Sequence, residues 1–263
     1  MSRAMVKIWG KVLVLGLLIW FLGWSPVWAE SLGDRLDHYP QWQDLPSLNP
    51  VQTGEDLIYP DWFAGTWQVA STLIDQVAPL APDLVTPGFA ANETLIGQPF
   101  LFRVRFQPRT NFLVQPLSLP KQSSTAAIVA DRAFNGAEIA QAYLGEKTVQ
   151  KVEVDPQHPN RQLTILKGDR RLISTVTGRA QAQPKPDQFF SSELTQQQFQ
   201  SSEQIYLNRV EITTDYQQLD SDHVTANQVT AIYLSSSDPD FFQAQNKPVA
   251  LYHYHLDLTK ISE

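Results

Sequence analysis

Residues 59–73 read YPDWFAGTWQVASTL and join a turn of aromatic residues to a strand. After Gly65 the pattern alternates, which places Trp67, Val69 and Ser71 on one face. Large aromatic residues near a strand entry usually close a core. We therefore predict a half-buried strand whose Trp62, Phe63 and Trp67 form a structural plug, with a ligand clamp as the alternative.

Further segments show the β-branched or aromatic alternation of strands. They are residues 100–106, 148–154, 162–167, 171–177, 205–216, 224–234 and 249–258, and residues 126–130 could add another. About eight strands in succession, with few helices between them, indicate an antiparallel meander. Closure into a barrel removes the exposed edges of such a meander and leaves room for side chains or one small ligand. We therefore predict a mainly β fold, an antiparallel barrel of about eight strands with one or two short helices.

The helices are expected at two places. Asn135 can cap a helix whose third residue is Glu138 and which Gly145 ends. Residues 191–204 are rich in Gln and Ser and form either a second helical turn or a polar loop. The segment 78–99 contains four Pro residues and is a loop, which either covers a barrel mouth or packs on the surface.

The N-terminus has the layout of a secretory signal. Arg3, Lys7 and Lys11 precede an apolar run over residues 12–24, and Ala29 offers a small residue before the cleavage site. The run has 13 residues, whereas a membrane-spanning helix needs roughly 20. We predict cleavage after residue 29 and a destination outside the cytoplasm. An uncleaved membrane anchor is the competing interpretation.

The mature chain is acidic and contains no Cys and no Met. It retains 17 basic and 27 acidic residues, a formal charge of −10, which argues against nucleic acid and anionic membranes as partners. The lack of thiols and thioethers suits an oxidising compartment. Residues 30–55 are polar and broken by Pro, with Tyr39 and Trp42 as isolated aromatics, and we predict an extended arm. Residues 56–263 are predicted to form the barrel domain.

Two motifs resemble the lipocalins and the wider calycin group. Gly65-Thr66-Trp67 is similar to their Gly-x-Trp signature, and Thr214-Asp215-Tyr216 to their Thr-Asp-Tyr motif. In these families a late basic residue lies against the Trp, for which Arg209 and Lys260 are the last candidates here.

A longer resemblance covers nearly the whole mature chain. Residues 59–67 together with residues 129–136, VADRAFNG, resemble a calycin-like family of cyanobacteria and plastids whose plant members are lumenal. The resemblance implies a calycin-like barrel in a thylakoid lumen or periplasm, and it implies no catalytic residues.

Six residues are candidate ligand contacts. Trp67 is the first, and Arg103 and Arg105 share one strand face, where they could hold a carboxylate or phosphate or simply be solvated. Their neighbours on the other face are apolar and better suited to the core. The others lie together on the last expected strand: Tyr252, His253 and His255.

His253 and His255 share a face, and a third ligand such as His223 or Asp257 could complete a metal site. Ordinary barrel lining explains the same run of aromatic rings. We therefore predict no metal ligand.

The expected function is binding of a small apolar or amphipathic ligand, such as a pigment or lipid. The alternative is an assembly or scaffold factor that contacts a membrane complex through its N-terminal arm or loops. The chain has no Gly-x-Ser-x-Gly, no His-Glu-x-x-His, no phosphate loop and no Cys nucleophile, so these motifs favour no enzymatic activity. A third alternative, an isomerase or hydrolase that uses the barrel interior, would need a polar cavity with a perturbed His or carboxylate. No particular cofactor is indicated.

Overall fold

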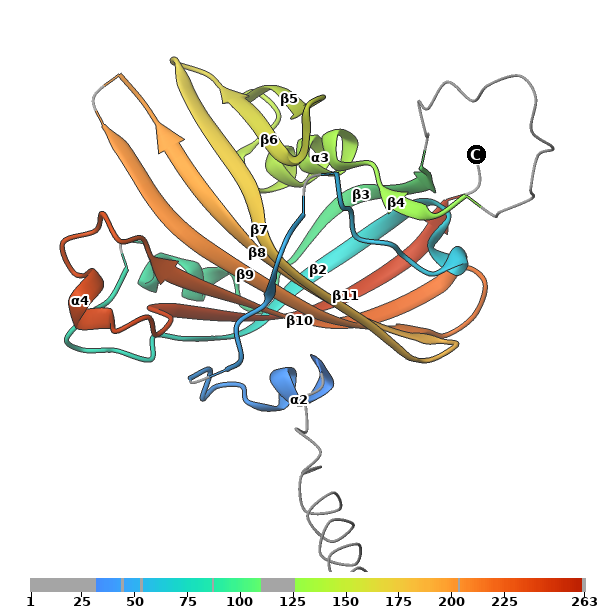
Figure 1. Ribbon diagram of the computed structural model, residues 1–263, viewed down its shortest axis with the longest axis horizontal. Helices are drawn as coiled ribbons and strands as arrows, with labels where there is room; N and C mark the ends of the chain where they lie inside the picture. The colour runs from blue at the N-terminus through green and yellow to red at the C-terminus, as the bar shows by residue number, and fades with distance from the viewer. Residues whose placement is uncertain are drawn as a thin grey trace, which may run out of the picture. The chain divides into compact units, whose positions relative to one another are not determined.

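One antiparallel sheet curls around the core of the protein (Figure 1). The structure, a computed structural model, describes residues 32–43, 45–52, 54–86, 88–109, 126–202 and 204–261. The strand order is β4-β3-β2-β11-β10-β9-β8-β7-β6-β5, and β1 pairs with β7. The strands are β1 (Asn49–Pro50), β2 (Gly65–Val77), β3 (Pro99–Pro108), β4 (Ile128–Ala130), β5 (Val149–Asp155), β6 (His158–Leu166), β7 (Arg170–Lys185), β8 (Gln188–Gln200), β9 (Ile205–Gln218), β10 (His223–Leu234) and β11 (Ala250–Ile261). The described helices are α2 (Leu32–Asp37), α3 (Arg132–Leu144) and α4 (Phe241–Ala244), with 3₁₀ turns η1 (Asp61–Phe63) and η2 (Ala90–Leu95).

The fold is mainly β and antiparallel, as predicted, but it is a half-barrel with more strands than the eight expected. The first long strand, β2, pairs with the last, β11, with Trp67 opposite Lys260. The ladder of strands is interrupted between β4 and β5. Among the described residues, the strand pairing therefore does not close into a complete ring.

Helix α3 fills this interruption, because it packs against β3 on one side and against β5 and β6 on the other (Figure 1). The side-chain amide of Asn135 accepts from the backbone N–H of Arg105 at 2.7 Å and donates to its carbonyl at 3.2 Å. Glu138 accepts from the backbone N–H of Arg103. Unpaired strand edges are commonly covered in this way, and α3 thus substitutes for a missing neighbouring strand.

The predicted start of α3 was wrong by four residues. The residue that caps the helix is Asp131, whose carboxylate accepts from the backbone N–H of Phe134 at 3.1 Å. Asn135 lies inside the helix and is buried against β3. Gly145 ends the helix as expected, with a φ of 86°. Asp131 and Asn135 are both residue types that can cap a helix, but the side chain of Asn135 is engaged by the backbone of β3 instead.

Strand β8 was not predicted, since the stretch over residues 191–204 suggested a helical turn or a polar loop. Its residues pair on both sides, with β7 and with β9. Several Gln residues in the strand have low intrinsic β propensity, but pairing with two long neighbours outweighs that preference. The interpretation as helix or loop was therefore wrong.

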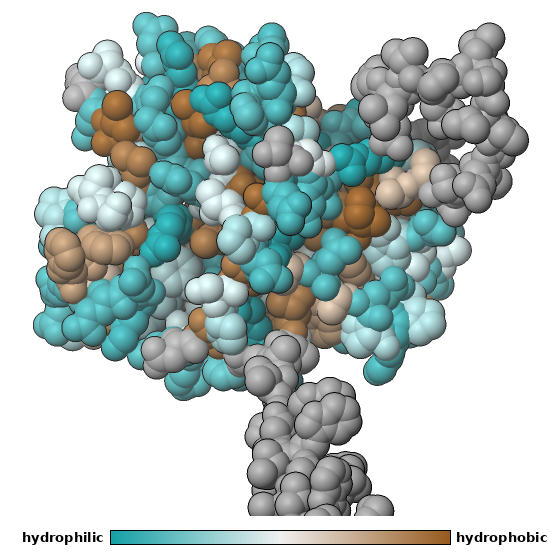
Figure 2. Space-filling model, viewed as in Figure 1, coloured by the Kyte–Doolittle hydropathy of each residue, from teal (hydrophilic) through white to brown (hydrophobic). Residues whose placement is uncertain are grey.

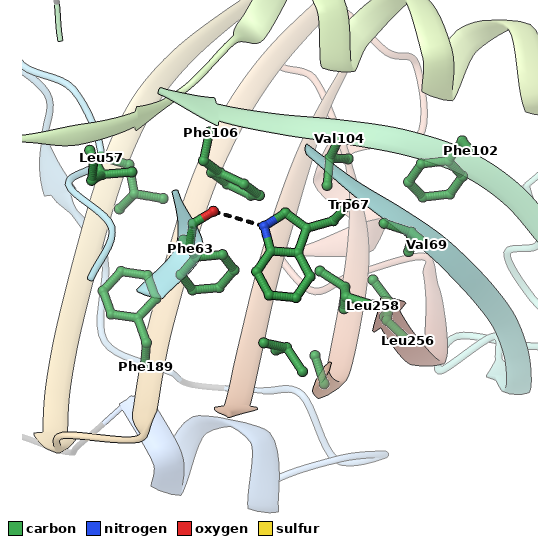
Figure 3. Packing of buried hydrophobic residues seen from close by; sticks show 13 residues of the cluster. Leu57, Phe63, Trp67, Val69, Phe102, Val104, Phe106, Phe189, Leu256 and Leu258 are labelled. Atoms are coloured by element: carbon green, nitrogen blue, oxygen red, sulfur yellow. Dashed lines mark hydrogen bonds between the residues drawn. The ribbon is translucent and has the colours of Figure 1, made fainter. Parts of the chain in front are cut away.

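The main core lies at the end of the sheet where β2 begins (Figure 3). Trp67 and Phe63 are fully buried there, and Val69 and Ser71 follow on the same face of β2. Phe102, Val104 and Phe106 of β3 face the same cluster, as the alternation predicted. The remaining buried members are Leu57, Ile128, Phe189, Val224, Ala226, Leu256 and Leu258. The predicted aromatic plug is thus the centre of the core.

The N-terminal segment packs on the convex face of the sheet. It begins with α2 and is therefore not wholly extended. Arg35 forms a buried ion pair with Glu211 at 2.8 Å. Trp42 is buried against Val229, Ala231 and Leu251. The described part of this arm belongs to the same compact unit as the sheet.

The predicted signal segment, residues 1–29, lies outside the described residues. Among the helices of the described ranges, none has the length and apolar character needed to cross a membrane.

Candidate functional site

The strand register arranges the concave face of the sheet in rows. The row beside the plug is apolar or aromatic and contains Phe189, Tyr216, Ala226 and Leu256. The next row is polar and contains Ser191, Thr214, Gln228 and Tyr254. A third row contains Glu193, Ile212, Thr230 and Tyr252, and a fourth contains Thr195, Val210, Ile232 and Ala250. Hydrogen-bonding groups therefore occupy the middle of the concave face, between apolar regions.

Ile212 lies at the centre of this face and is 39 % exposed. Its two neighbours on β9 point to the convex face, and both are polar and buried, since Glu211 is 4 % and Thr213 0 % exposed. The usual distribution is the reverse, with the aliphatic residue buried and the polar residues in water. The convex face is covered by the N-terminal arm, whereas the middle of the concave face is open to solvent.

Three tyrosines from two elements converge on the polar rows. The hydroxyl of Tyr143 on α3 is 3.4 Å from that of Ser71, and the hydroxyl of Tyr252 accepts a hydrogen bond from Asn92 at 3.1 Å. Burial, followed by the neighbouring hydroxyls of Tyr143 and Tyr252, raises the pKa of Tyr254. Within the described part of the chain, no side chain forms a hydrogen bond with the Tyr254 hydroxyl, which leaves a donor for a ligand.

A cluster of charges lies at the β8 end of the third row. Glu193 contacts Arg132 at 2.9 Å and Arg179 at 2.7 Å, and Asp56 contacts Arg132 at 2.8 Å. Burial alone would raise the pKa of Glu193, but the two guanidinium groups outweigh it and hold that pKa below its usual value. Two cations and two anions balance each other. We therefore interpret the cluster as a fastening of α3 and the segment before β2 to strands β7 and β8.

The plug closes the concave face at one end. The indole N–H of Trp67 donates to the carbonyl of Phe63 at 2.8 Å (Figure 3). The ammonium of Lys260 lies 5.2 Å from the centroid of the indole ring. Gly65 has a φ of 120°, and a Cβ on it would lie 2.9 Å from the Lys260 side chain. Of the two late basic candidates it is Lys260 that covers the Trp, while Arg209 lies over Tyr233.

The family described as Domain of unknown function (DUF6816) matches residues 52–262. The chain belongs to this family. No curated protein and no solved structure matches the chain. The DUF6816 match covers α3 and every strand from β2 to β11, and so includes the plug and the concave rows, whereas α2 and β1 precede it.

Arg103 and Arg105 lie on the outer face of β3 in this DUF6816 domain, and both are paired with α3. Arg103 contacts Glu138 at 2.6 Å, and Arg105 contacts Asp131 at 2.6 Å. The guanidinium of Arg105 also lies 4.3 Å from the ring centroid of Phe134. Both guanidinium groups therefore hold α3 at the edge of the sheet, and neither of them faces the concave rows.

The three candidate ligand contacts on β11 lie on different faces of the sheet. Tyr252 belongs to the concave rows, whereas His253 and His255 point to the convex side. The His253 ring lies 4.9 Å from that of Tyr39, and burial lowers the pKa of His253. His255 Nε2 is 3.4 Å from an oxygen of Asp257. In the described residues, no three His, Cys, Asp or Glu side chains are grouped so that they could hold a metal ion.

Three important residues of the concave face were not predicted from the sequence, namely Glu193, Ile212 and Gln228, and Thr214 was noted only as part of the Thr-Asp-Tyr motif. Glu193 lies in the stretch interpreted as helix or loop. The alternation of β9 did predict that Ile212 and Thr214 share a face, but alternation alone does not say which face is open. That depends on the N-terminal arm, which covers the other side.

Proposed function

We propose that the concave face binds a small amphipathic molecule, with its polar part on the rows of hydroxyl and amide groups and its apolar part against Ile212. The observation that carries the proposal is the inversion on β9, where the concave aliphatic residue is exposed and its polar neighbours are buried. An exposed aliphatic residue among hydrogen-bonding side chains suits a ligand that has both an apolar part and a polar part.

The surroundings of this face support the same proposal. Phe89 and η2 lie beside Tyr252, with ring centroids 5.9 Å apart and a hydrogen bond from Asn92 to the tyrosine hydroxyl. Tyr143 approaches from α3 on another side and is 40 % exposed. The concave rows therefore have aromatic walls on two sides, which favours a ligand with an apolar or conjugated body.

We further propose a calycin-like relationship for the domain. Its support is the curled antiparallel sheet together with Gly65, Trp67 and Lys260 in one contact at the plug. A calycin-like carrier would hold its ligand in the barrel interior, which agrees with the concave position proposed here.

Native mass spectrometry of the mature chain, tagged and purified from its own cells, tests the ligand proposal. We expect a bound small molecule on the wild type and at least a tenfold lower occupancy in Ile212→Lys. The reason is that an ammonium group buried beneath an apolar ligand costs more than about 1.4 kcal/mol, the free energy that corresponds to a tenfold change in affinity.

Ile205→Lys is the matched control, because it makes the same substitution on the same strand at a side chain that is 60 % exposed and points to the other face. It should retain the ligand like the wild type. A wild-type protein without any bound molecule, or equal occupancy in both variants, would contradict the proposal.

We propose that the protein is exported to a thylakoid lumen or periplasm. The basic start, the 13-residue apolar run and Ala29 support this. Mass analysis of the protein from its own cells should give an N-terminus at Glu30. A product that begins at Met1, or one found in the cytoplasmic fraction, would contradict export.

The scaffold alternative finds less support. That hypothesis was based on the aromatic residues Tyr39 and Trp42 of the N-terminal arm. Trp42 is buried against the protein's own sheet, and the Tyr39 hydroxyl donates to Asp75 at 2.7 Å. Over the face drawn in Figure 2, apolar residues are separated by polar ones, without the continuous apolar area typical of a large interface. Ligand binding is therefore the function that we favour.

A further inference from the structure

A second feature lies on the convex face, where a cleft of about 360 Å³ separates the N-terminal arm from β8, β9 and β10. Arg209, Glu211 and Tyr233 form part of its floor, and the loop after α4 contributes Lys247 to its wall. These strand residues alternate with those of the concave rows, so the cleft and the concave face are on opposite sides of the sheet.

The charges in this cleft do not balance. Arg35 is neutralised by Glu211 in the buried ion pair described above. Arg209 and Lys247 have no carboxylate within ion-pair distance in the ranges that the structure describes, and Arg209 donates only to the amide oxygen of Asn246 at 3.1 Å. Because the chain as a whole carries a formal charge of −7, two uncompensated cations in one cleft are a local exception that favours an anion.

A buried donor also lines the cleft. Trp42 is 1 % exposed, and its indole N–H makes no hydrogen bond of good geometry with the described residues. The indole N–H interacts with the hydroxyl of Tyr233 without a well-aligned hydrogen bond. That hydroxyl itself donates to Glu211 at 3.3 Å. Buried polar groups of proteins are nearly always satisfied, and an acceptor that enters the cleft would give this donor a better-aligned partner than the Tyr233 hydroxyl.

The loop that supplies Lys247 has an unusual backbone. Gln245 and Asn246 both have positive φ values, 51° and 60°, and both line the cleft. Residues other than Gly adopt the left-handed conformation uncommonly, and such residues tend to cluster at functional sites. Here they place the Asn246 side chain on Arg209 and bring Lys247 to the same wall.

We propose that this cleft binds a small organic carboxylate with an apolar body. The carboxylate would be bound by Arg209 and Lys247 and would accept from the Trp42 indole. Leu45, Leu48 and Leu194 provide an apolar wall for the rest of the molecule. This binding site is separate from the concave one and does not depend on the function proposed above.

Titration of the ¹⁵N-labelled mature chain with 2-naphthoate tests the proposal. Only three tryptophans, Trp42, Trp62 and Trp67, remain after residue 29, so their indole N–H resonances are readily assigned. We expect the Trp42 resonance to shift in a saturable manner while that of Trp67, already bonded to Phe63, stays in place. Uncharged 2-naphthamide should bind at least tenfold more weakly, since it lacks the charge that the two cations recognise.

Variants show whether the two cations are responsible. Arg209→Gln with Lys247→Gln should weaken 2-naphthoate binding at least tenfold. Lys167→Gln with Arg170→Gln removes the same charge at the β6–β7 turn, where Arg170 bonds only to the Lys167 carbonyl, and should bind like the wild type.

Three results would overturn the proposal: a Trp42 resonance that does not move at millimolar 2-naphthoate, equal binding of acid and amide, or equal weakening in the two double variants. Ile212→Lys should leave this titration unchanged, because Ile212 lies on the other face. A loss of the Trp42 shift in Ile212→Lys would also count against a separate site. Failure of the concave site therefore remains distinguishable from failure of this one.

Discussion

Replacement of Trp67 with Ala is expected to lower the free energy of unfolding by about 3–5 kcal/mol, the range for removal of a buried aromatic ring. The ring is fully buried between Phe63, Val69 and the β3 residues, and its N–H bonds to the Phe63 carbonyl. Truncation would leave a cavity and an unsatisfied carbonyl, and would remove the contact with Lys260. Denaturant unfolding followed by circular dichroism measures the change.

Trp62→Ala is the matched control for this prediction. Trp62 is only partly buried, stacks on Phe63 at 4.2 Å and donates to the Pro186 carbonyl at 3.0 Å. We expect it to cost roughly 1–2 kcal/mol, because less area is buried. Equal effects of the two substitutions would show that Trp67 is not the centre of the core.

Glu193→Ala is expected to lower the free energy of unfolding by about 3–5 kcal/mol, the range for breaking a buried ion pair by removing one partner. Arg179 would lose its closest carboxylate, with only Asp56 remaining at 3.9 Å. The side chain of Arg179 is 5 % exposed and that of Glu193 is 21 % exposed, so water that enters after truncation compensates only in part for the lost carboxylate. Chemical denaturation at pH 7 measures the loss.

The same substitution should change the pH dependence of stability. The pKa of Glu193 is lowered in the folded protein, so its contribution is complete above the unfolded pKa of about 4.3 and is lost as the pH falls through the lower folded value. The difference between wild type and Glu193→Ala should therefore shrink in acid.

Glu153→Ala serves as the control, because Glu153 forms an exposed ion pair with Lys151. Its removal should cost less than about 1 kcal/mol. A constant difference between wild type and Glu193→Ala from pH 7 to pH 3 would contradict the assigned role of Glu193.

Much of the fold followed from alternation along single strands. The pattern from Trp67 to Leu73 correctly separated the core face from the outer face, and so did Phe102, Val104 and Phe106 beside Arg103 and Arg105. Strand β8 was not predicted, because its many Gln and Ser residues do not produce the alternation of apolar and polar side chains that marks a strand. Its place between β7 and β9 depends on partners far away in the sequence.

The concave rows were much less accessible to sequence reasoning. His253 and Tyr252 are adjacent in the chain, yet one contacts Tyr39 on the convex side and the other faces the polar rows. Their alternation was visible, but the identity of the open face was not. Similarly, Arg209 and Lys247 are separated by 38 positions, and only the return of the chain after α4 brings them to one cleft.

The sequence by itself determined an acidic, cysteine-free, antiparallel β protein whose aromatic plug is centred on Trp67, because residue type and alternation act over a few neighbouring positions. The tertiary structure alone decided that α3 replaces a strand at the open edge and that the N-terminal arm covers the convex face. It also decided that Ile212 remains in contact with water. These features result from contacts between residues that are distant in the chain, and no local pattern specifies which of two strand faces such a partner will cover.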